Sequence, residues 1–409
     1  MNLETKQRCR LTGDPLEVVL NLGRQPLGNG FIKSESENEF FYDLRCGFSP
    51  VSQLFQIIDQ PPPEIMFHDS YAFYSGTSSR MSHHFKMFSD AIVAKGYLAE
   101  MPFVVEVGCN DGIFLKNIKD RGIPHLGVEP SRNVANVAKT LGVNVLQDFF
   151  NLETAQAIIQ DYGKASVVVA ANVMCHIPDI KGVALAMATL LKPNGVLIFE
   201  DPYLGDVVRL GSYDQIYDEH VFLFSALSVS KIFAEVGLEL IDVEPQPTHG
   251  GSMRYTLSAI GRRPKTEAVG TLMAEEVRQG LDRMETFYAF AQRVAKSAKA
   301  LRDALEELKS KNLRVAAYGA TSKSTTIYNF VQIDKTLISC VFDNSVSKIG
   351  KLTPGTHIPI VEEAQFAIHA PDVTFLAAWN HEREIIDRYP DYSKSGRLWL
   401  THLPSARFV

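Results

Sequence analysis

Val104-Val-Glu-Val-Gly-Cys-Asn-Asp-Gly-Ile113 is the stretch of this 409-residue chain that decides its fold. Its first four residues are apolar apart from Glu106 and end at a glycine, which is typical of a buried strand. Gly108 and Gly112 allow a tight turn and a close approach of backbone to ligand, and a helix pattern follows. This strand–turn–helix unit is the one with which α/β enzymes hold a nucleotide-like cofactor.

Length and composition predict a globular protein with room for two or three domains. Apolar residues make up 45% and charged residues 22%, and the formal net charge is −6, which favours neither nucleic acid nor a membrane surface as a partner. No apolar run approaches the roughly 18 residues of a membrane span, and Met1-Asn-Leu-Glu-Thr-Lys6 lacks an apolar signal core. We therefore expect a cytoplasmic protein whose five scattered cysteines are free thiols.

Strand and helix patterns alternate through the chain, which predicts an α/β fold with parallel strands and helical crossovers. After a helical stretch at 81–98, the alternating segments are 103–107, 112–120, 125–128, 133–141, 143–146, 167–171, 182–191 and 195–200. A long amphipathic helix over 273–308, with a break near Gly280, precedes a second set at 314–317, 323–330, 337–342 and 374–377.

Three domains are predicted from this pattern. Residues 1–70 are rich in turn formers and suit a small β-rich lobe. Residues 71–245 suit a Rossmann-like cofactor-binding domain, and residues 246–409 suit a second Rossmann-like α/β domain.

Acidic residues after successive strands favour S-adenosylmethionine as the cofactor. The turn lacks the G-x-G-x-x-G spacing of a pyrophosphate cradle, and its acid suits a ligand that carries a sulfonium and an ammonium. Glu129 ends the second strand, where a carboxylate accepts both ribose hydroxyls. The predicted cofactor-binding residues are Glu106, Gly108, Asn110, Asp111, Gly112, Glu129, Asp148, Phe149 and Asn172. An NAD site is the weaker alternative because it requires the wider glycine spacing.

Proton-handling groups gather in Asp214-Gln-Ile-Tyr-Asp-Glu-His-Val-Phe-Leu-Phe-Ser225. His220 can act as a general base, and a neighbouring carboxylate can fix its tautomer. A histidine in an aromatic stretch is more often packed in a core, so this string alone only suggests catalysis. His176 lies at a predicted strand end, where sites form in α/β sheets, whereas His249 is as consistent with a simple turn.

With these residues in place, the chain resembles the sugar-nucleotide C-3 methyltransferases of deoxysugar biosynthesis, such as those of the tetronitrose pathway. The match runs nearly end to end and includes several rare strings. They are Leu22-Gly-Arg-Gln-Pro-Leu27, Ser75-Gly-Thr-Ser78, Val107-Gly-Cys-Asn-Asp-Gly112, Cys175-His-Ile-Pro178, Phe199-Glu-Asp-Pro-Tyr-Leu204, Tyr217-Asp-Glu-His220, His249-Gly-Gly251, Tyr318-Gly-Ala-Thr321 and Ala378-Trp-Asn-His381.

The resemblance implies a zinc-binding N-terminal domain, a central methyltransferase domain and a C-terminal domain that helps to hold a nucleotide sugar. It implies methylation at C-3 of a nucleotide-linked 4-keto-6-deoxysugar through an enolate. The acid–base residues that it carries over are His220 as the base, Tyr217, Glu219, His176 and Tyr71. We expect this small ketosugar as the partner and a monomer or weak homodimer as the assembly.

Three other functions are compatible with the sequence. One is O- or N-methylation of a nucleotide sugar, which would use the same cofactor site. Another is an NAD-dependent sugar-nucleotide oxidoreductase or epimerase. The third is a catalytically inactive binding protein, against which the intact Tyr217–His220 string argues.

The second α/β unit has its own glycine turn before a predicted helix. Free amides at a helix start suit phosphate, and the resemblance implies contact with the nucleotide diphosphate, although a simple turn is an equal alternative. The string is not a P-loop, because it lacks G-x-x-x-x-G-K-[ST]. The predicted substrate-binding residues are His249, Tyr318, Gly319, Lys323, Asp343, Trp379 and Asn380.

One departure from the family concerns zinc, which the family holds with two C-x-x-C pairs. Here these pairs read Cys9-Arg-Leu-Thr12 and Cys46-Gly-Phe-Ser49. Tetrahedral structural zinc needs four nitrogen or sulfur ligands. We therefore predict that no metal is bound, that apolar packing holds the lobe, and that Cys9 and Cys46 lie close together. A site completed by histidines is the alternative.

Overall fold

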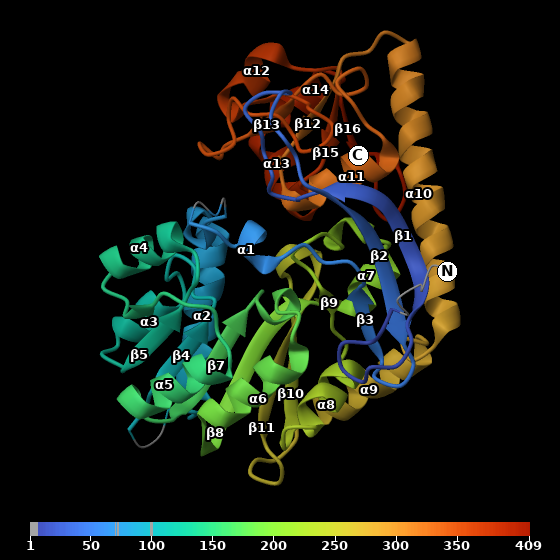
Figure 1. Ribbon diagram of the computed structural model, residues 1–409. Helices are drawn as coiled ribbons and strands as arrows, with labels where there is room; N and C mark the ends of the chain where they lie inside the picture. Colours follow the sequence, from blue (N-terminus) through green and yellow to red (C-terminus); the bar gives the residue numbers. More distant parts are fainter. Residues whose placement is uncertain (1–6, 70, 72, 99–100) are drawn as a thin grey trace.

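The computed structural model describes residues 7–69, 71, 73–98 and 101–409 (Figure 1). Three sheets organise them: a four-stranded sheet, a seven-stranded sheet and a six-stranded sheet. Figure 1 shows the N-terminal strands beside the long helix α10 (Met284–Ser310), with the last part of the chain above them. In the described part of the chain no helix is both long and apolar enough to cross a membrane.

The central sheet has seven strands in the order β10-β11-β8-β7-β4-β5-β6. They are β4 (Val104–Val107), β5 (His125–Val128), β6 (Val145–Leu146), β7 (Ala165–Ala171), β8 (Leu191–Pro202), β10 (Leu238–Gln246) and β11 (Ser252–Ala259). β4 to β8 pair in parallel, whereas β11 runs antiparallel to both of its neighbours. This order is that of the Rossmann-like sheet of class I methyltransferases, which confirms the predicted fold class.

Helices cover both faces of the central sheet because successive residues of its inner strands are apolar and point to opposite faces. Val105 and Val168 enter one buried apolar cluster, and Val104 and Val167 enter another on the opposite face. The helices that supply the first cluster are α5 (Leu152–Tyr162), α6 (Ile180–Leu190) and α8 (Ala226–Ala234). Those that supply the second are α2 (Ser79–Ala94), α3 (Leu115–Lys119) and α4 (Arg132–Thr140).

The central sheet continues beyond the domain boundary that the sequence suggested after residue 245. β10 and β11 pair from Leu238 with Ala259 to Gln246 with Ser252. The suggested boundary therefore falls at the end of one strand of a paired hairpin, which the sequence analysis did not recognise.

The N-terminal lobe contains β1 (Glu17–Pro26), β2 (Phe41–Ser49) and β3 (Leu54–Ile57) in antiparallel order, followed by α1 (Pro63–Met66). A short strand from the central region, β9 (Phe222–Leu223), pairs with β3 and completes this sheet. The sheet packs on α10 (Met284–Ser310), where the rings of Phe48 and Phe287 lie 4.3 Å apart between centroids. The lobe is therefore joined to both other parts of the molecule.

The predicted break in the long helix is confirmed. α9 (Glu267–Arg278) and α10 are separate helices, and Gly280 lies between them with a φ of +76°. This conformation is accessible to glycine without strain, and it ends the first helix.

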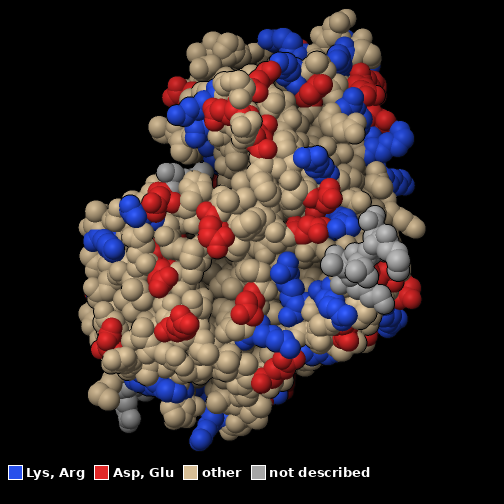
Figure 2. All heavy atoms as spheres, in the orientation of Figure 1, with Lys and Arg blue, Asp and Glu red and all other residues tan. Residues whose placement is uncertain are grey.

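The C-terminal sheet has the order β14-β13-β12-β15-β16-β17, of which only the last pair is antiparallel. Its strands are β12 (Val315–Tyr318), β13 (Val341–Asp343), β14 (Ile360–Glu362), β15 (Val373–Leu376), β16 (Leu398–Thr401) and β17 (Arg407–Phe408). Its helices are α11 (Ser322–Val331), α12 (Phe366–His369), α13 (Glu382–Arg388) and α14 (Pro390–Lys394). The strand predicted over 337–342 is shorter than expected and begins at Val341. On the face in Figure 2, acidic and basic residues are interspersed.

Candidate active site

A cavity of about 350 Å³ opens at the carboxyl edge of the central sheet, between that edge, the N-terminal lobe and the start of α11. Its wall brings together many of the predicted site residues. All five predicted acid–base residues line it, namely Tyr71, His176, Tyr217, Glu219 and His220. The predicted cofactor-binding residues Gly108, Asn110, Glu129, Phe149 and Asn172 line it, as do the predicted substrate-binding residues His249, Lys323 and Asn380.

The turn after β4 presents its backbone to this cavity. Gly108 has a φ of +67°, and a Cβ at this position would lie 2.4 Å from a methyl group of Val173. The amide of Gly108 donates a hydrogen bond of 2.8 Å to the carbonyl of Val128, which ties the turn to the next strand. Glycine is therefore required here both for the backbone angle and for space.

Glu129 holds the same turn from the end of β5. Its carboxylate accepts hydrogen bonds from the amide of Asn110 at 3.0 Å and from the amide of Ser131 at 2.9 Å. Burial raises the pKa of Glu129 above its ordinary value, although both amides act against this effect. Glu129 thus orders the turn and also faces the cavity, where a carboxylate can accept ribose hydroxyls.

Four predicted cofactor residues do not line the cavity. Glu106 lies buried behind the turn, where burial raises its pKa well above the usual range, as do the nearby charges of Asp111 and Glu129. Asp111 accepts a hydrogen bond of 2.7 Å from the amide of Gly76, and Gly112 packs against Ala138. Asp148 is exposed and accepts from the amide of Phe149 at 2.8 Å. These four residues stabilise the turns around the cavity and do not form part of its wall.

His220 is held in one tautomer by two neighbours. Its Nδ1 lies 2.7 Å from the carbonyl oxygen of Gln215, and its Nε2 lies 2.8 Å from the hydroxyl of Tyr217. A carbonyl only accepts, so Nδ1 carries the proton and Nε2 presents a lone pair. The expectation that a carboxylate fixes the tautomer is wrong, because the Gln215 carbonyl occupies that position.

His220 and His176 are neutral near pH 7. Burial lowers the pKa of His220 well below its ordinary value, and the positive charge of Lys323 lowers it further. Burial also lowers the pKa of His176 to about 4. The ring of His176 stacks on that of His220, with 5.4 Å between centroids, and Phe67 stacks on His176 at 5.5 Å. The histidines therefore form a dry, fixed stack of uncharged rings.

Glu219 contacts two donors that come from distant parts of the chain. The hydroxyl of Tyr71 donates to one carboxylate oxygen at 3.0 Å, and the side-chain amide of Asn29 donates to the other at 2.8 Å. Asn29 also lines the cavity, and sequence analysis did not identify it. The only hint was its position two residues after the Leu22–Leu27 string.

Two lysines lie at the start of α11, Lys323 buried in its first turn and Lys348 half-buried beside it. The ammonium of Lys323 donates to the carbonyl of His249 at 3.2 Å, and burial lowers its pKa to about 8. The ammonium of Lys348 donates to the carbonyl of Ala320 at 2.8 Å, and burial lowers its pKa as well. Among the described residues neither forms an ion pair with a carboxylate, so both can meet an anion. Lys348 was not predicted, because it lies in a loop without a recognisable motif.

The other predicted substrate residues support the C-terminal wall from behind. Asp343 accepts from the amide of Ala320 at 2.7 Å, and Gly319, with a φ of +97°, leaves room for Ala378. The hydroxyl of Tyr318 donates to Glu363. Trp379 donates from its indole nitrogen to Asp214 at 2.6 Å. None of the four predicted residues, Tyr318, Gly319, Asp343 and Trp379, lines the cavity.

Comparison with known proteins identifies the family of enzymes to which this chain belongs. Three family models match: a putative zinc binding domain over residues 9–67, a methyltransferase domain over 83–243 and a C-methyltransferase C-terminal domain over 247–404. C-methyltransferase NovU of Streptomyces niveus is 30% identical over 98% of this chain and 96% of that protein. The chain belongs to the S-adenosylmethionine-dependent C-methyltransferases.

More distant relatives match only part of this C-methyltransferase. A ubiquinone biosynthesis O-methyltransferase of Colwellia psychrerythraea is 26% identical over 44% of this chain and 66% of that protein. A solved structure of magnesium protoporphyrin IX methyltransferase from Synechocystis PCC 6803, with bound S-adenosylmethionine, covers 43% of this chain and 78% of that one. Its identity is 15% and its TM-score is 0.33.

The cavity wall of the C-methyltransferase suits the predicted cofactor. Gly108 and Val173 both line the cavity, and the lack of a Cβ at Gly108 makes room for the Val173 side chain. Glu129 offers a carboxylate for ribose, and Phe149, which is 40% exposed, offers a ring for stacking. S-adenosylmethionine is the cofactor, and the alternative of an NAD-dependent oxidoreductase is set aside.

The N-terminal lobe of this C-methyltransferase does not suit structural zinc. The thiol of Cys9 lies 3.2 Å from the hydroxyl of Ser52 and accepts from Gln56 at 3.3 Å. Cys46 is completely buried, and burial raises its pKa far above the usual range, which disfavours a thiolate ligand. Both cysteines belong to one apolar cluster, while their close approach stays a prediction. Among the described residues, the group of three metal-type ligands that lie together is Cys175, His176 and His220, outside the lobe.

Restoring the two missing thiols is expected to create a zinc site. In the Thr12→Cys, Ser49→Cys double variant, two C-x-x-C pairs would again supply four sulfur ligands. We expect about one zinc per chain by elemental mass spectrometry, and a loss of thermal stability with EDTA. The matched control is Thr12→Ala, Ser49→Ala. Wild-type protein that carried stoichiometric zinc would contradict this interpretation of the lobe.

Proposed function

We propose that this C-methyltransferase acts at C-3 of a nucleotide-linked 4-keto-6-deoxysugar. The observation that carries the proposal is the unprotonated Nε2 of His220, fixed on the cavity wall by Gln215 and Tyr217. A saturated sugar carbon becomes a nucleophile when a neighbouring carbonyl acidifies its proton and a base removes it, so C-methylation at such a carbon needs a base of this kind. A hydroxyl or amine is already a nucleophile, so its methylation depends less on a base.

In the proposed reaction, Nε2 of His220 removes the C-3 proton, and the electron pair of that bond forms an enolate with its charge on the C-4 oxygen. Substrate entry displaces the Tyr217 hydroxyl from Nε2. This frees Tyr217 to donate to the developing oxyanion, together with His176. Glu219, which is held away from His220 by Asn29 and Tyr71, accepts from a sugar hydroxyl. S-adenosylmethionine, when bound, supplies the electrophilic methyl group.

The part of the cavity wall formed by Lys348 and the start of α11 suits the nucleotide diphosphate. Lys323 and Lys348 place two ammonium groups there, and the first amides of α11 add hydrogen-bond donors. The capping box at the start of α11 pairs the amides of Thr321 and Ser324 with each other's side chains. It uses only those two amides, so other amides of the first turn can meet a ligand. A sugar diphosphate that is bound here would extend toward His220.

The test is a screen of nucleotide-linked sugars, including dTDP and GDP forms of 4-keto and non-keto sugars, with S-adenosylmethionine. We expect mass spectrometry to show a gain of one methyl group on a ketosugar only. In D2O, we expect deuterium to enter C-3 when S-adenosylhomocysteine replaces the methyl donor. Methyl transfer to oxygen or nitrogen without this exchange would contradict the proposal.

The two lysines predict an alkaline limit for substrate capture. Because burial lowers the pKa of Lys323 to about 8, its positive charge is present below that pH and is lost as the pH rises through it. We expect kcat/KM for the nucleotide sugar to fall above about pH 8, while kcat at saturation changes less, because a bound diphosphate favours the charged lysine. The Lys323→Met variant should lack this fall in kcat/KM. If the fall persists in the variant, another group is responsible for it.

A further inference from the structure

One short segment of the N-terminal lobe, residues 27–31, lines the cavity with Asn29 and contacts the loop at 214–220. We propose that this segment positions the 214–220 loop, and that Asn29 is the residue that holds Glu219 in its working orientation. The proposal rests on the proposed function for the role of Glu219 toward substrate. The hold on the carboxylate follows from contacts that do not depend on the substrate.

Two adjacent residues of the segment hold two adjacent carboxylates of the loop. The amide of Gly28 donates to Asp218 at 3.0 Å, and the side-chain amide of Asn29 donates to Glu219 at 2.8 Å. Each pair is separated by 190 residues of sequence. A carboxylate that has two donors from different elements, as Glu219 has with Asn29 and Tyr71, is fixed in rotation as well as position.

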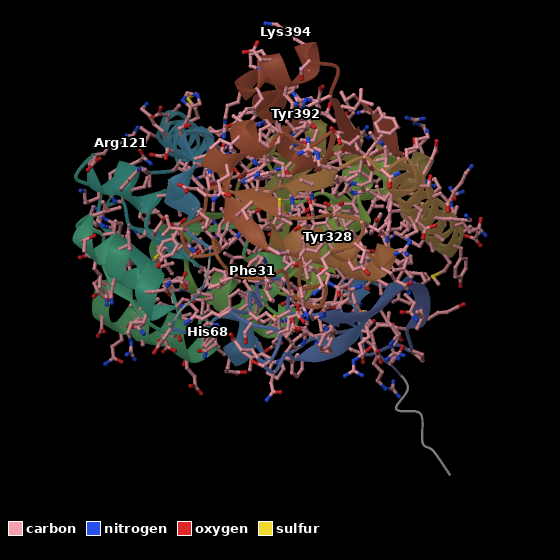
Figure 3. The ribbon with its side chains drawn as sticks, turned by 90° about the horizontal axis from the view of Figure 1, so that it is seen from above. Phe31, His68, Arg121, Tyr328, Tyr392 and Lys394 are labelled. Atoms are coloured by element: carbon pink, nitrogen blue, oxygen red, sulfur yellow. The ribbon has the colours of Figure 1, made fainter. Side chains whose placement is uncertain are left out.

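The segment is itself fixed from the opposite side by the C-terminal domain. The hydroxyl of Thr325 in α11 donates to the carbonyl of Gly28 at 2.9 Å. The ammonium of Lys348 lies 5.0 Å from the ring centre of Phe31, and Ile32 forms a β-bridge with Leu352. Phe31 is labelled near the middle of the view in Figure 3, inward of His68. The segment therefore lies between the loop and the domain that carries the lysines.

Packing leaves no freedom at Gly28. A Cβ on this residue would lie 2.8 Å from a carboxylate oxygen of Asp218, 3.1 Å from the Cβ of Ser322 and 3.3 Å from the ring of Tyr217. Ser322 begins α11, and Tyr217 contacts His220. The position thus touches both the start of the proposed diphosphate site and the base.

Asn29 also controls the charge of Glu219. Burial raises the pKa of the Glu219 carboxyl, and the donor from Asn29 is the strongest of the effects that oppose this rise. The groups that face this carboxyl are Asp218, Tyr217, Tyr71, Tyr42, Cys175 and Lys348. Without the amide of Asn29, a proton would bind Glu219 at a higher pH, and the carboxyl would lose one of its two anchors.

The contacts of Gly28 and Asn29 give the N-terminal lobe a role at the active site that does not involve a metal. The lobe lacks a ligand set that suits zinc, yet it retains a rigid sheet that delivers Gly28 and Asn29 to the cavity. Its sheet in turn includes β9, which follows the 214–220 loop directly. We infer that the lobe is retained because it completes the methyl-transfer site.

The experiment compares Asn29→Ala and Asn29→Asp with a matched control, Asn21→Ala, an exposed asparagine of β1 in the same lobe. In each protein, labelling with glutamate that carries ¹³C at the carboxyl carbon allows an NMR pH titration, and Glu219→Gln assigns the resonance. We expect the apparent pKa of Glu219 to rise in Asn29→Ala and to stay unchanged in Asn21→Ala. A pKa of Glu219 that is the same in wild type and Asn29→Ala overturns the proposal.

Kinetics with the nucleotide ketosugar form the second arm. Loss of a hydrogen bond to a charged group predicts a fall in kcat of about 10- to 100-fold in Asn29→Ala, with S-adenosylhomocysteine affinity unchanged. The acid limb of the rate profile should move to higher pH, because activity is lost as the pH falls through the raised pKa. Asn29→Asp, which adds a third carboxylate, should lose more. A wild type that does not act on ketosugars, together with a raised Glu219 pKa in Asn29→Ala, overturns the proposed function and supports the positioning role.

Discussion

Replacement of His220 by asparagine is expected to lower kcat by about 10²- to 10⁴-fold, the usual contribution of a general base. The amide of asparagine can still donate to the Gln215 carbonyl, as Nδ1 of the histidine does at 2.7 Å. No lone pair of comparable basicity then remains where Nε2 was. In the described part of the chain the side-chain hydrogen bonds of His220 go to Gln215 and Tyr217 and not to the turn at 108–112, so affinity for S-adenosylhomocysteine should be unchanged in calorimetry.

The same variant should lose exchange of the C-3 proton for deuterium. His369→Asn, a change at an exposed histidine of α12, is the matched control and should exchange at the wild-type rate. Exchange that survives in His220→Asn would remove His220 from the role of base. Tyr217, whose hydroxyl is the only polar side-chain group in contact with Nε2 among the described residues, would then be the first group to examine.

The Glu129→Ala variant should bind S-adenosylhomocysteine about 10- to 100-fold more weakly, as expected when a charged hydrogen-bond acceptor is removed. Two effects combine. The carboxylate is lost from the cavity wall, and the amides of Asn110 and Ser131 lose the acceptor that orders the turn. The measurement is calorimetric titration of the variant and of wild type under the same conditions.

Stability provides a second measure of the same change. Each buried amide that is left without a partner costs about 1–3 kcal/mol, so the free energy of unfolding in denaturant should fall as well. Glu153→Ala, at an exposed position in α5, is the control and should bind the ligand as wild type does. Unchanged affinity in Glu129→Ala would show that the cofactor does not lie against this carboxylate.

The sequence predicted the cofactor turn because its elements are local. An apolar strand, a glycine with no alternative and a helix start all lie within ten residues of Val104. The pattern did not indicate which side chains of this string line the cavity. Glu106 and Asp111 belong to the same string as Gly108 and Asn110, yet they do not line the cavity, because Glu106 is buried behind the turn and Asp111 accepts from the amide of Gly76.

The sequence could not predict the residues that long-range packing brings to the site. Asn29 meets Glu219 across 190 positions, and Lys348 lies in a loop whose local sequence indicates only a turn. The hairpin of β10 and β11 was missed for a related reason. Its pairing with β8 is a tertiary feature, and a register shift between Leu240 and Asp242 interrupts the alternation of apolar and charged residues that would mark β10 as a strand.

The contacts of the 214–220 loop have a consequence for synthesis of the chain. Thr326 donates to the carbonyl of Ile216 at 3.0 Å, and the indole of Trp379 donates to Asp214 at 2.6 Å. Both partners leave the ribosome long after the loop itself. A nascent chain that stops before Thr326 would contain the whole cofactor turn without either of these two supports for the 214–220 loop. If His220 is the base, as we propose, shortened products of this kind should bind the methyl donor without transferring its methyl group.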